Sequence, residues 1–98
     1  MKTLTEQYYS VTNTRAIKVK FMPPTTHKGA RVKITDDYLA ERKQSIVLSY
    51  DYEIADVAKQ AFKFLTDKGF DVVCRASDEN QYLFMVNNWS ENYLTLKG

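Results

Sequence analysis

The chain has few of the residues that catalytic and metal sites need. It contains one cysteine, Cys74, and one histidine, His27, so it cannot form an internal disulfide and offers no cluster of soft metal ligands. Its three glycines lie too far apart for a phosphate-binding loop. The sequence places no orienting partner beside His27, which we interpret as a surface residue. We expect no enzyme activity, no cofactor, no metal ion and no small-molecule substrate.

Long hydrophobic runs are also missing. No apolar run approaches the roughly 20 residues of a membrane span, and the first ten residues, MKTLTEQYYS, lack the apolar core of a signal peptide. We expect a cytoplasmic protein without membrane contact, and the single cysteine fits a reducing compartment. Hydrophobic residues make up 44% of the chain, which is enough for one core, so we predict a single domain over residues 1–98.

Acidic residues are absent from residues 14–35, TRAIKVKFMPPTTHKGARVKIT, and this gap is the most informative one. The stretch carries six basic residues: Arg15, Lys18, Lys20, Lys28, Arg31 and Lys33. The chain has a formal net charge of +2 and the stretch alone carries +6, which leaves −4 for the remainder. Such a local excess of positive charge favours an anionic partner.

Hydrophobic and basic residues alternate in two parts of this stretch, IKVKF at residues 17–21 and RVKI at residues 31–34. Alternation with a period of two is typical of a half-buried strand. We predict strands at residues 12–22 and 30–35, with a loop between them that follows Pro23-Pro24. The two strands would form a β-hairpin with one apolar face and one basic face.

A helix is the clearest element in the second half of the chain. Residues 52–68 repeat apolar side chains at helical spacing, with Asp51 as the expected N-cap and Gly69 as the expected left-handed cap. Phe70 then stands where a residue often packs back on the helix. The apolar side of this helix is expected to comprise Ile54, Val57, Ala58, Ala61, Phe62 and Leu65.

Three more strands and three irregular segments complete the prediction. The strands are expected at residues 45–50, 70–76 and 81–86. The irregular segments are a loose lead-in at residues 1–10, the stretch 36–44 and a tail at 87–98. For residues 36–44 a loop is favoured over an irregular continuation of the hairpin or one helical turn, and the tail would either add a short sixth strand or lie against the sheet edge. The order β-β-β-α-β-β predicts an α+β fold, in which one helix packs on one face of an antiparallel sheet of about five strands.

The two faces of this sheet are expected to differ in chemistry. The covered face should hold Ile17, Val19, Val32, Ile34, Leu48, Val72 and Phe84, and Cys74 is predicted to turn into the core as a small hydrophobic residue. The open face should present Lys18, Lys20, Arg31 and Lys33. An exposed basic face is typical of proteins that bind nucleic acid phosphates or an acidic protein groove, although solvated strands also carry lysine.

Three motifs give the chain a family resemblance. TNTR at residues 12–15, SIVLSYDYE at residues 45–53 and a helix that closes on Lys68-Gly69 resemble a pattern found in small phage and plasmid proteins. That group is associated with anti-CRISPR proteins that inhibit type I-F surveillance complexes. The resemblance covers about residues 11–86. It implies a sheet-plus-helix inhibitor in the host cell cytoplasm that binds a bacterial CRISPR effector and blocks its target nucleic acid.

The chain also departs from the group's pattern. Ala16 stands where the group has glycine and Phe70 where it has tryptophan. The segments at residues 23–29 and 36–44 are longer than the group's links, and a tail follows Val86. Added loops are places where a new partner surface is built.

For the inhibitor hypothesis, the six basic residues named above are the first candidates for partner contact. The secondary candidates are Asn13, Asp36, Asp37, Tyr38, Glu41 and Trp89. In a structural alternative, Asn13 hydrogen-bonds the local backbone and Arg15 pairs with Asp51 or with a carboxylate on a neighbouring strand.

Two other hypotheses use the same features. One is a small nucleic-acid-binding regulator that contacts phosphates through the basic face. The other is an assembly module that adds a strand at an exposed sheet edge.

Overall fold

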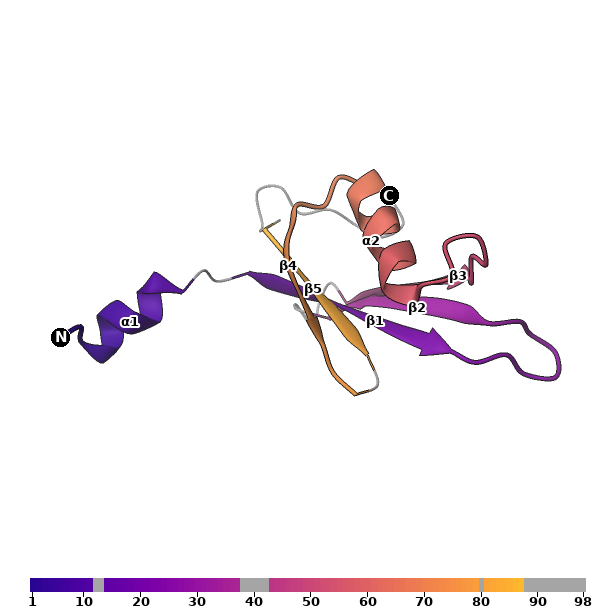
Figure 1. The fold of residues 1–98 in the computed structure, drawn as a ribbon, viewed down its shortest axis with the longest axis horizontal. Helices are drawn as coiled ribbons and strands as arrows, with labels where there is room; N and C mark the ends of the chain where they lie inside the picture. Colours follow the sequence, from indigo (N-terminus) through magenta and orange to yellow (C-terminus); the bar gives the residue numbers. More distant parts are fainter. Residues whose placement is uncertain (12–13, 38–42, 80, 88–98) are drawn as a thin grey trace.

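The structure is a computed structural model that describes residues 1–11, 14–37, 43–79 and 81–87. The elements in chain order are α1 (Leu4–Ser10), β1 (Arg15–Met22), β2 (Arg31–Asp36), β3 (Gln44–Ser49), α2 (Val57–Asp67), β4 (Val72–Ser77) and β5 (Tyr82–Val86). The five strands form an antiparallel sheet in the order β3-β2-β1-β5-β4. Helix α2 packs on one face of this sheet, and α1 lies apart from it (Figure 1). The predicted α+β fold is confirmed.

The core lies between α2 and the sheet, where the hydrophobic alternation predicts it. In the β1–β2 hairpin Val19 is directly opposite Ile34, and both are fully buried. The other buried hydrophobic residues are Ile17, Val32, Ala61, Leu65, Phe70, Phe84 and Val86. Leu48 and Val72 pack against this cluster, so the predicted covered face is confirmed. Full burial of one such large side chain contributes about 1.5–3 kcal/mol.

Helix α2 begins later than predicted. Its N-cap is Asp56, whose carboxylate accepts a hydrogen bond from the backbone N–H of Lys59 at 3.1 Å. The preceding Ala55 has a φ of 55°, a left-handed conformation that a right-handed helix cannot contain. Asp51, the predicted N-cap, instead accepts a hydrogen bond from the N–H of Glu53 at 2.9 Å in a local turn. The chain therefore makes a separate turn before α2 starts.

The end of α2 is the predicted glycine cap. Gly69 has a φ of 97°. Its N–H donates to the carbonyl of Thr66, and the N–H of Phe70 donates to the carbonyl of Leu65, both at 3.0 Å. This pair of hydrogen bonds is a Schellman motif, which satisfies the last helical carbonyls. It also turns Phe70 into the core, where the side chain is only 4% exposed.

A buried polar residue of α2 fixes the helix to the end of β3. The Gln60 side chain donates to the carbonyl of Ser49 at 2.8 Å and accepts from the N–H of Asp51 at 3.0 Å. Both backbone groups belong to the segment that leaves the sheet. Because buried polar groups are costly without partners, this paired amide favours one position of α2 over the sheet.

The N-terminal segment is a helix, and the predicted loose lead-in is wrong in this respect. Thr3 and Glu6 form a reciprocal capping box at the start of α1. Tyr8 and Tyr9 contact each other edge to face, with ring centroids 5.0 Å apart, and both remain exposed. No residue of α1 is buried. None of the helices in the described ranges is long and apolar enough to cross a membrane.

Two edge features also correct the prediction. Cys74 is an exposed free thiol on β4 rather than a core residue, because most of β4 is exposed at the sheet edge. At the other side of the sheet, β2 extends to Asp36 and β3 begins at Gln44, so both ends of the predicted 36–44 loop belong to strands. The pair Asp36–Gln44 closes the β2–β3 register.

Candidate functional site

The open side of the β1–β2 hairpin carries a compact set of cations. Alternation puts them on the face opposite the buried Val19 and Ile34. We call this set the basic face, and it comprises Lys18, Lys20, Arg31 and Lys33. Lys20 and Lys33 are exposed, whereas the other two are partly covered. Neighbouring positions on such a face lie roughly 5 Å apart across strands and roughly 7 Å apart along one strand.

The centre of the basic face is a pair of like charges. Lys20 and Lys33 are directly opposite each other in the β1–β2 register. Directly opposed like charges destabilise a sheet, and within the described residues neither ammonium group has an ion-pair partner. As far as the described residues go, the two charges are available to an anionic group from outside.

The two ends of the basic face differ from its centre. The ammonium group of Lys18 lies 3.1 Å from Asp37 Oδ2, and both side chains are partly exposed, so this charge is partly neutralised. Arg31 is partly covered, and its Nε has no hydrogen-bond partner among the residues that the structure describes. Asp37 therefore serves as a local counter-charge at one end, while Arg31 keeps an unmatched donor at the other.

Arg15 and Asp36 lie in the core and not on a binding surface, which corrects their expected exposure. Each side chain is 1% exposed, and Arg15 Nη2 lies 3.4 Å from Asp36 Oδ2. The Arg15 guanidinium also stands 5.6 Å from the ring centroid of Phe70. Gln44 donates a hydrogen bond to Asp36 Oδ2 at 3.2 Å. Arg15 thus pairs with a carboxylate on a neighbouring strand, as the structural alternative held.

The remaining candidates are dispersed or undescribed. Lys28 is exposed in the loop between β1 and β2. Its backbone N–H donates a hydrogen bond to the Thr25 hydroxyl, and its carbonyl accepts one from the Thr25 N–H. His27 is exposed in the same loop, as predicted. Four secondary candidates lie outside the described residues: Asn13, Tyr38, Glu41 and Trp89. The structure therefore brings together four of the six predicted basic residues.

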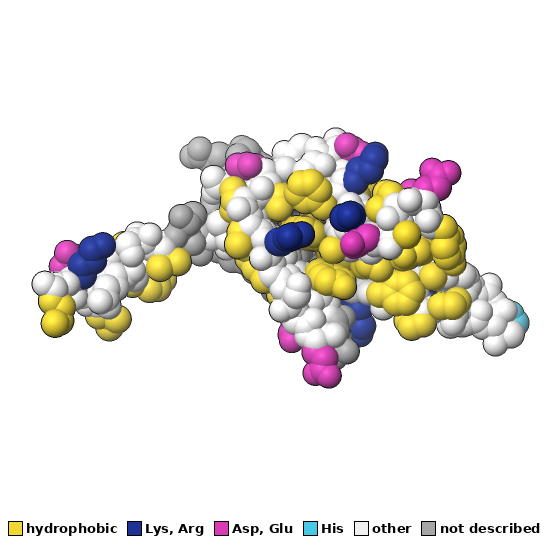
Figure 2. Space-filling model, viewed as in Figure 1, with side chains coloured by type: hydrophobic (Ala, Val, Ile, Leu, Met, Phe, Trp, Pro, Cys, Tyr) yellow, Lys and Arg dark blue, Asp and Glu magenta, His cyan; other side chains and the backbone are white. Residues whose placement is uncertain are grey.

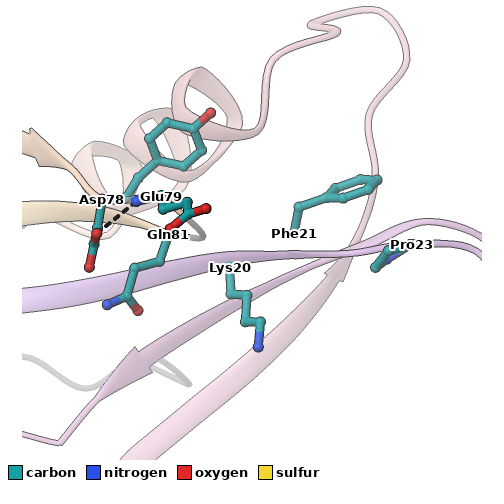
Figure 3. Close-up of a pocket in the computed structure, with 7 residues that line it drawn as sticks. Lys20, Phe21, Pro23, Asp78, Glu79 and Gln81 are labelled. Carbon is teal, nitrogen blue, oxygen red and sulfur yellow. Dashed lines mark hydrogen bonds between the residues drawn. The ribbon is translucent and has the colours of Figure 1, made fainter.

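A hollow of about 480 Å³ borders the basic face at the β4–β5 turn, where β5 begins. β1 continues beyond its last pair with β5, Val19 opposite Tyr82, and the hollow lies beside this extension. Figure 3 shows Lys20 and Phe21 pointing to opposite sides of β1, with Asp78 and Glu79 at the turn across the hollow. Its lining carries charges of both signs and is largely exposed, so we treat it as the rim of the basic face.

A second concave surface lies between α2 and the β4–β5 hairpin. It has a volume of about 310 Å³ and is lined in part by Phe62, Arg75 and Phe84. The sequence predicts Phe62 on the apolar side of the helix, but its side chain is 45% exposed. Its ring is tilted against the ring of Phe84, with the two ring centroids 6.0 Å apart. Figure 2 shows hydrophobic side chains on the body of the molecule with charges of both signs between them. This mixed surface contrasts with the basic face, where four cations lie together.

The comparisons with known proteins add no assignment to this geometry. Protein-family models, curated proteins and solved structures gave no match to the chain. Within the described ranges, no three His, Cys, Asp or Glu side chains gather as metal ligands would. Among the described residues, the basic face is the arrangement whose chemistry suits the binding of an anion.

Proposed function

We propose that the protein is a counter-defence inhibitor of a mobile genetic element, such as a phage, that binds a bacterial CRISPR effector complex in the host cytoplasm. In this proposal the basic face docks on the effector and excludes its target nucleic acid by steric overlap. The observation that carries the proposal is the like-charge pair Lys20–Lys33 at the centre of that face, for which the described residues supply no ion-pair partner. The resemblance at residues 12–15 and 45–53 supplies the class of partner.

The physical basis of the proposal is a difference in electrostatic energy between free and bound states. Two like charges held in register cost stability in the free protein. An anionic partner removes that cost and adds favourable pairs, so association gains from both terms. Complementary charge of this kind raises association rates and selects the partner. No covalent chemistry is required.

The test is a charge reversal on the basic face with a matched control. Lys20→Glu with Lys33→Glu replaces one like-charge pair with another, so the change in fold stability is small. Lys2→Glu with Lys59→Glu makes the same change in net charge on exposed residues of the N-terminal segment and α2. We expect the control and the unchanged protein to bind the effector and to rescue phage in CRISPR-bearing hosts. The Lys20/Lys33 variant should do neither.

Two results would contradict this proposal. One is a folded Lys20/Lys33 variant that still binds the effector and rescues phage. The other is an unchanged protein that captures no effector subunit and rescues no phage across hosts with several CRISPR types. Circular dichroism of each variant establishes that the fold is retained.

A second candidate function, a nucleic-acid-binding regulator, is favoured by the same cluster of four cations. It predicts a salt dependence that an effector-specific inhibitor need not show. If all four cations of the basic face contact phosphates, a rise from about 50 to about 200 mM salt weakens duplex binding about a hundredfold. Binding of the effector in the absence of nucleic acid would favour the inhibitor over the regulator.

A further inference from the structure

β3 forms one edge of the sheet and is unusually regular for an edge strand. It pairs with β2 through all six of its residues without a register shift. The other edge strand, β4, has an irregularity between Val72 and Cys74 and carries Arg75. Natural edges are usually protected by charge, proline or a bulge. The sequence of β3, QSIVLS, has no charge and no proline, and within the described residues no strand pairs with its outer side.

The direction of the backbone groups on β3 follows from one hydrogen bond. The N–H of Tyr50 donates to the carbonyl of Ala30 at 3.0 Å, so Tyr50 directs its backbone groups towards the β2 side. In an antiparallel pair this direction alternates along the strand. Leu48 and Ile46 therefore also face β2. The N–H and C=O groups that point outward belong to Ser45, Val47 and Ser49.

The sequence around Val47 is nearly symmetric. Read in either direction, Ser45–Ser49 runs serine, branched aliphatic, valine, branched aliphatic, serine. Two antiparallel copies of such a strand match themselves when the symmetry axis passes through the central residue. Val47 then faces the partner's Val47, and Ile46 faces the partner's Leu48. Ser45 faces the partner's Ser49.

We propose that two copies of the chain pair through β3 about a twofold axis at Val47. The outward backbone groups of three residues on each strand meet their counterparts in about six hydrogen bonds. The result is a continuous sheet in which each copy contributes its five strands. This self-matching sequence points to a second copy rather than to an unrelated strand, because an unrelated strand requires no such symmetry. The proposal is independent of the function proposed above.

The pairing preserves the two faces of the sheet. Val47 lies on the same face as Lys33, since the two are opposite in the β2–β3 register, and its side chain is 46% exposed. With Val47 on the axis, both basic faces lie on one side of the joined sheet. Lys33 and the partner's Lys33 are separated by three strand spacings, roughly 14 Å. This exceeds the screening length of about 8 Å at physiological salt, so repulsion across the axis is weak.

The test is self-association of the purified chain, measured by sedimentation equilibrium from about 1 to about 500 µM protein. Val47→Glu places two carboxylates face to face on the axis, whereas within one copy the new carboxylate faces Lys33. We expect a dimer for the unchanged protein and a dissociation constant at least about tenfold higher for Val47→Glu. Val73→Glu, on the 50% exposed position of β4, is the matched control and should leave the dimer intact.

A charge-exchange experiment makes the test specific for the axis. Val47→Lys should also weaken self-association, but an equimolar mixture of Val47→Glu and Val47→Lys should form a mixed dimer, because opposite charges then meet on the axis. An unchanged protein that remains monomeric up to about 500 µM would overturn the proposal. So would loss of the dimer in Val73→Glu with retention in Val47→Glu. A host protein captured through Val47 by a monomeric chain would likewise overturn it, since β3 would then serve another partner.

Discussion

The buried ion pair between Arg15 and Asp36 gives the sharpest stability prediction. Removing one partner leaves the other charged side chain in the core, 1% exposed and without this ion pair. We consider Arg15→Met and Asp36→Leu, which replace each charged side chain by an apolar one, and the double variant that carries both. The partly exposed pair Lys18–Asp37 joins the same two regions on the opposite face and provides a comparison.

The two ion pairs are expected to contribute differently to stability, because the contribution depends on burial more than on the distance between the charged atoms. Breaking a buried pair from one side costs about 3–5 kcal/mol. A small domain has a total stability of about 5–15 kcal/mol, so each single variant loses a large share of it. The double variant should lose less than either single one, because two apolar groups of similar volume need no charge compensation. Lys18 and Asp37 are closer, at 3.1 Å, but their partial exposure limits the contribution of this pair to about 1 kcal/mol.

Urea unfolding followed by circular dichroism measures these differences. The denaturant dependence of a small protein is about 1–3 kcal/mol per M, so each single variant should unfold at least about 1 M earlier. A Lys18→Met variant should shift the midpoint much less. The reasoning is refuted if Arg15→Met costs less than about 1 kcal/mol, or if the double variant loses the sum of the two single losses.

Two further predictions concern α2. Leu65→Ala should destabilise the protein by about 2–5 kcal/mol in urea unfolding, because Leu65 is fully buried. Phe62→Ala should lower the free energy of unfolding clearly less, because Phe62 is 45% exposed. Equal losses of stability in the two variants would contradict this packing. The hydrogen bond from Lys63 to Asp67 raises the pKa of Lys63 above 10.5, so the stabilising contribution of this pair is complete below that pH and is lost as the pH rises through the raised pKa. A pH titration of Lys63 by NMR should show its pKa falling when Asp67→Asn is introduced, and an unchanged pKa would exclude the pair.

The sequence predicts the core of the fold because the signals involved are local. Val19 and Ile34 follow strict alternation, and Gly69 is the one residue near the helix end that tolerates a left-handed conformation. The same alternation also indicates where Arg15 belongs. Arg15 precedes Ile17 by two residues, and Asp36 follows Ile34 by two, so both share the covered face. Their charge, taken alone, wrongly indicates the surface.

The start of α2 is harder to predict because the sequence offers two N-cap residues. Asp51 and Asp56 are both good N-cap residues, and the choice depends on contacts between α2 and β3, such as the hydrogen bond from Gln60 to Ser49. Those contacts exist only once the sheet has formed. The start of α1, by contrast, is encoded locally by the capping box of Thr3 and Glu6. The pairing of Lys20 with Lys33 across β1 and β2 depends on strand register, which a single sequence does not give.

The exposed thiol of Cys74 makes the protein measurable as a whole. It is the only sulfhydryl in the chain, so a maleimide dye attaches at one atom without any engineered residue. β4 and β3 are the two opposite margins of the sheet. In two copies joined at β3, the attached dyes stand at the outermost strands, nine strand spacings or roughly 40 Å apart. Resonance energy transfer between a donor dye on one copy and an acceptor dye on the other would then report the distance across the dimer.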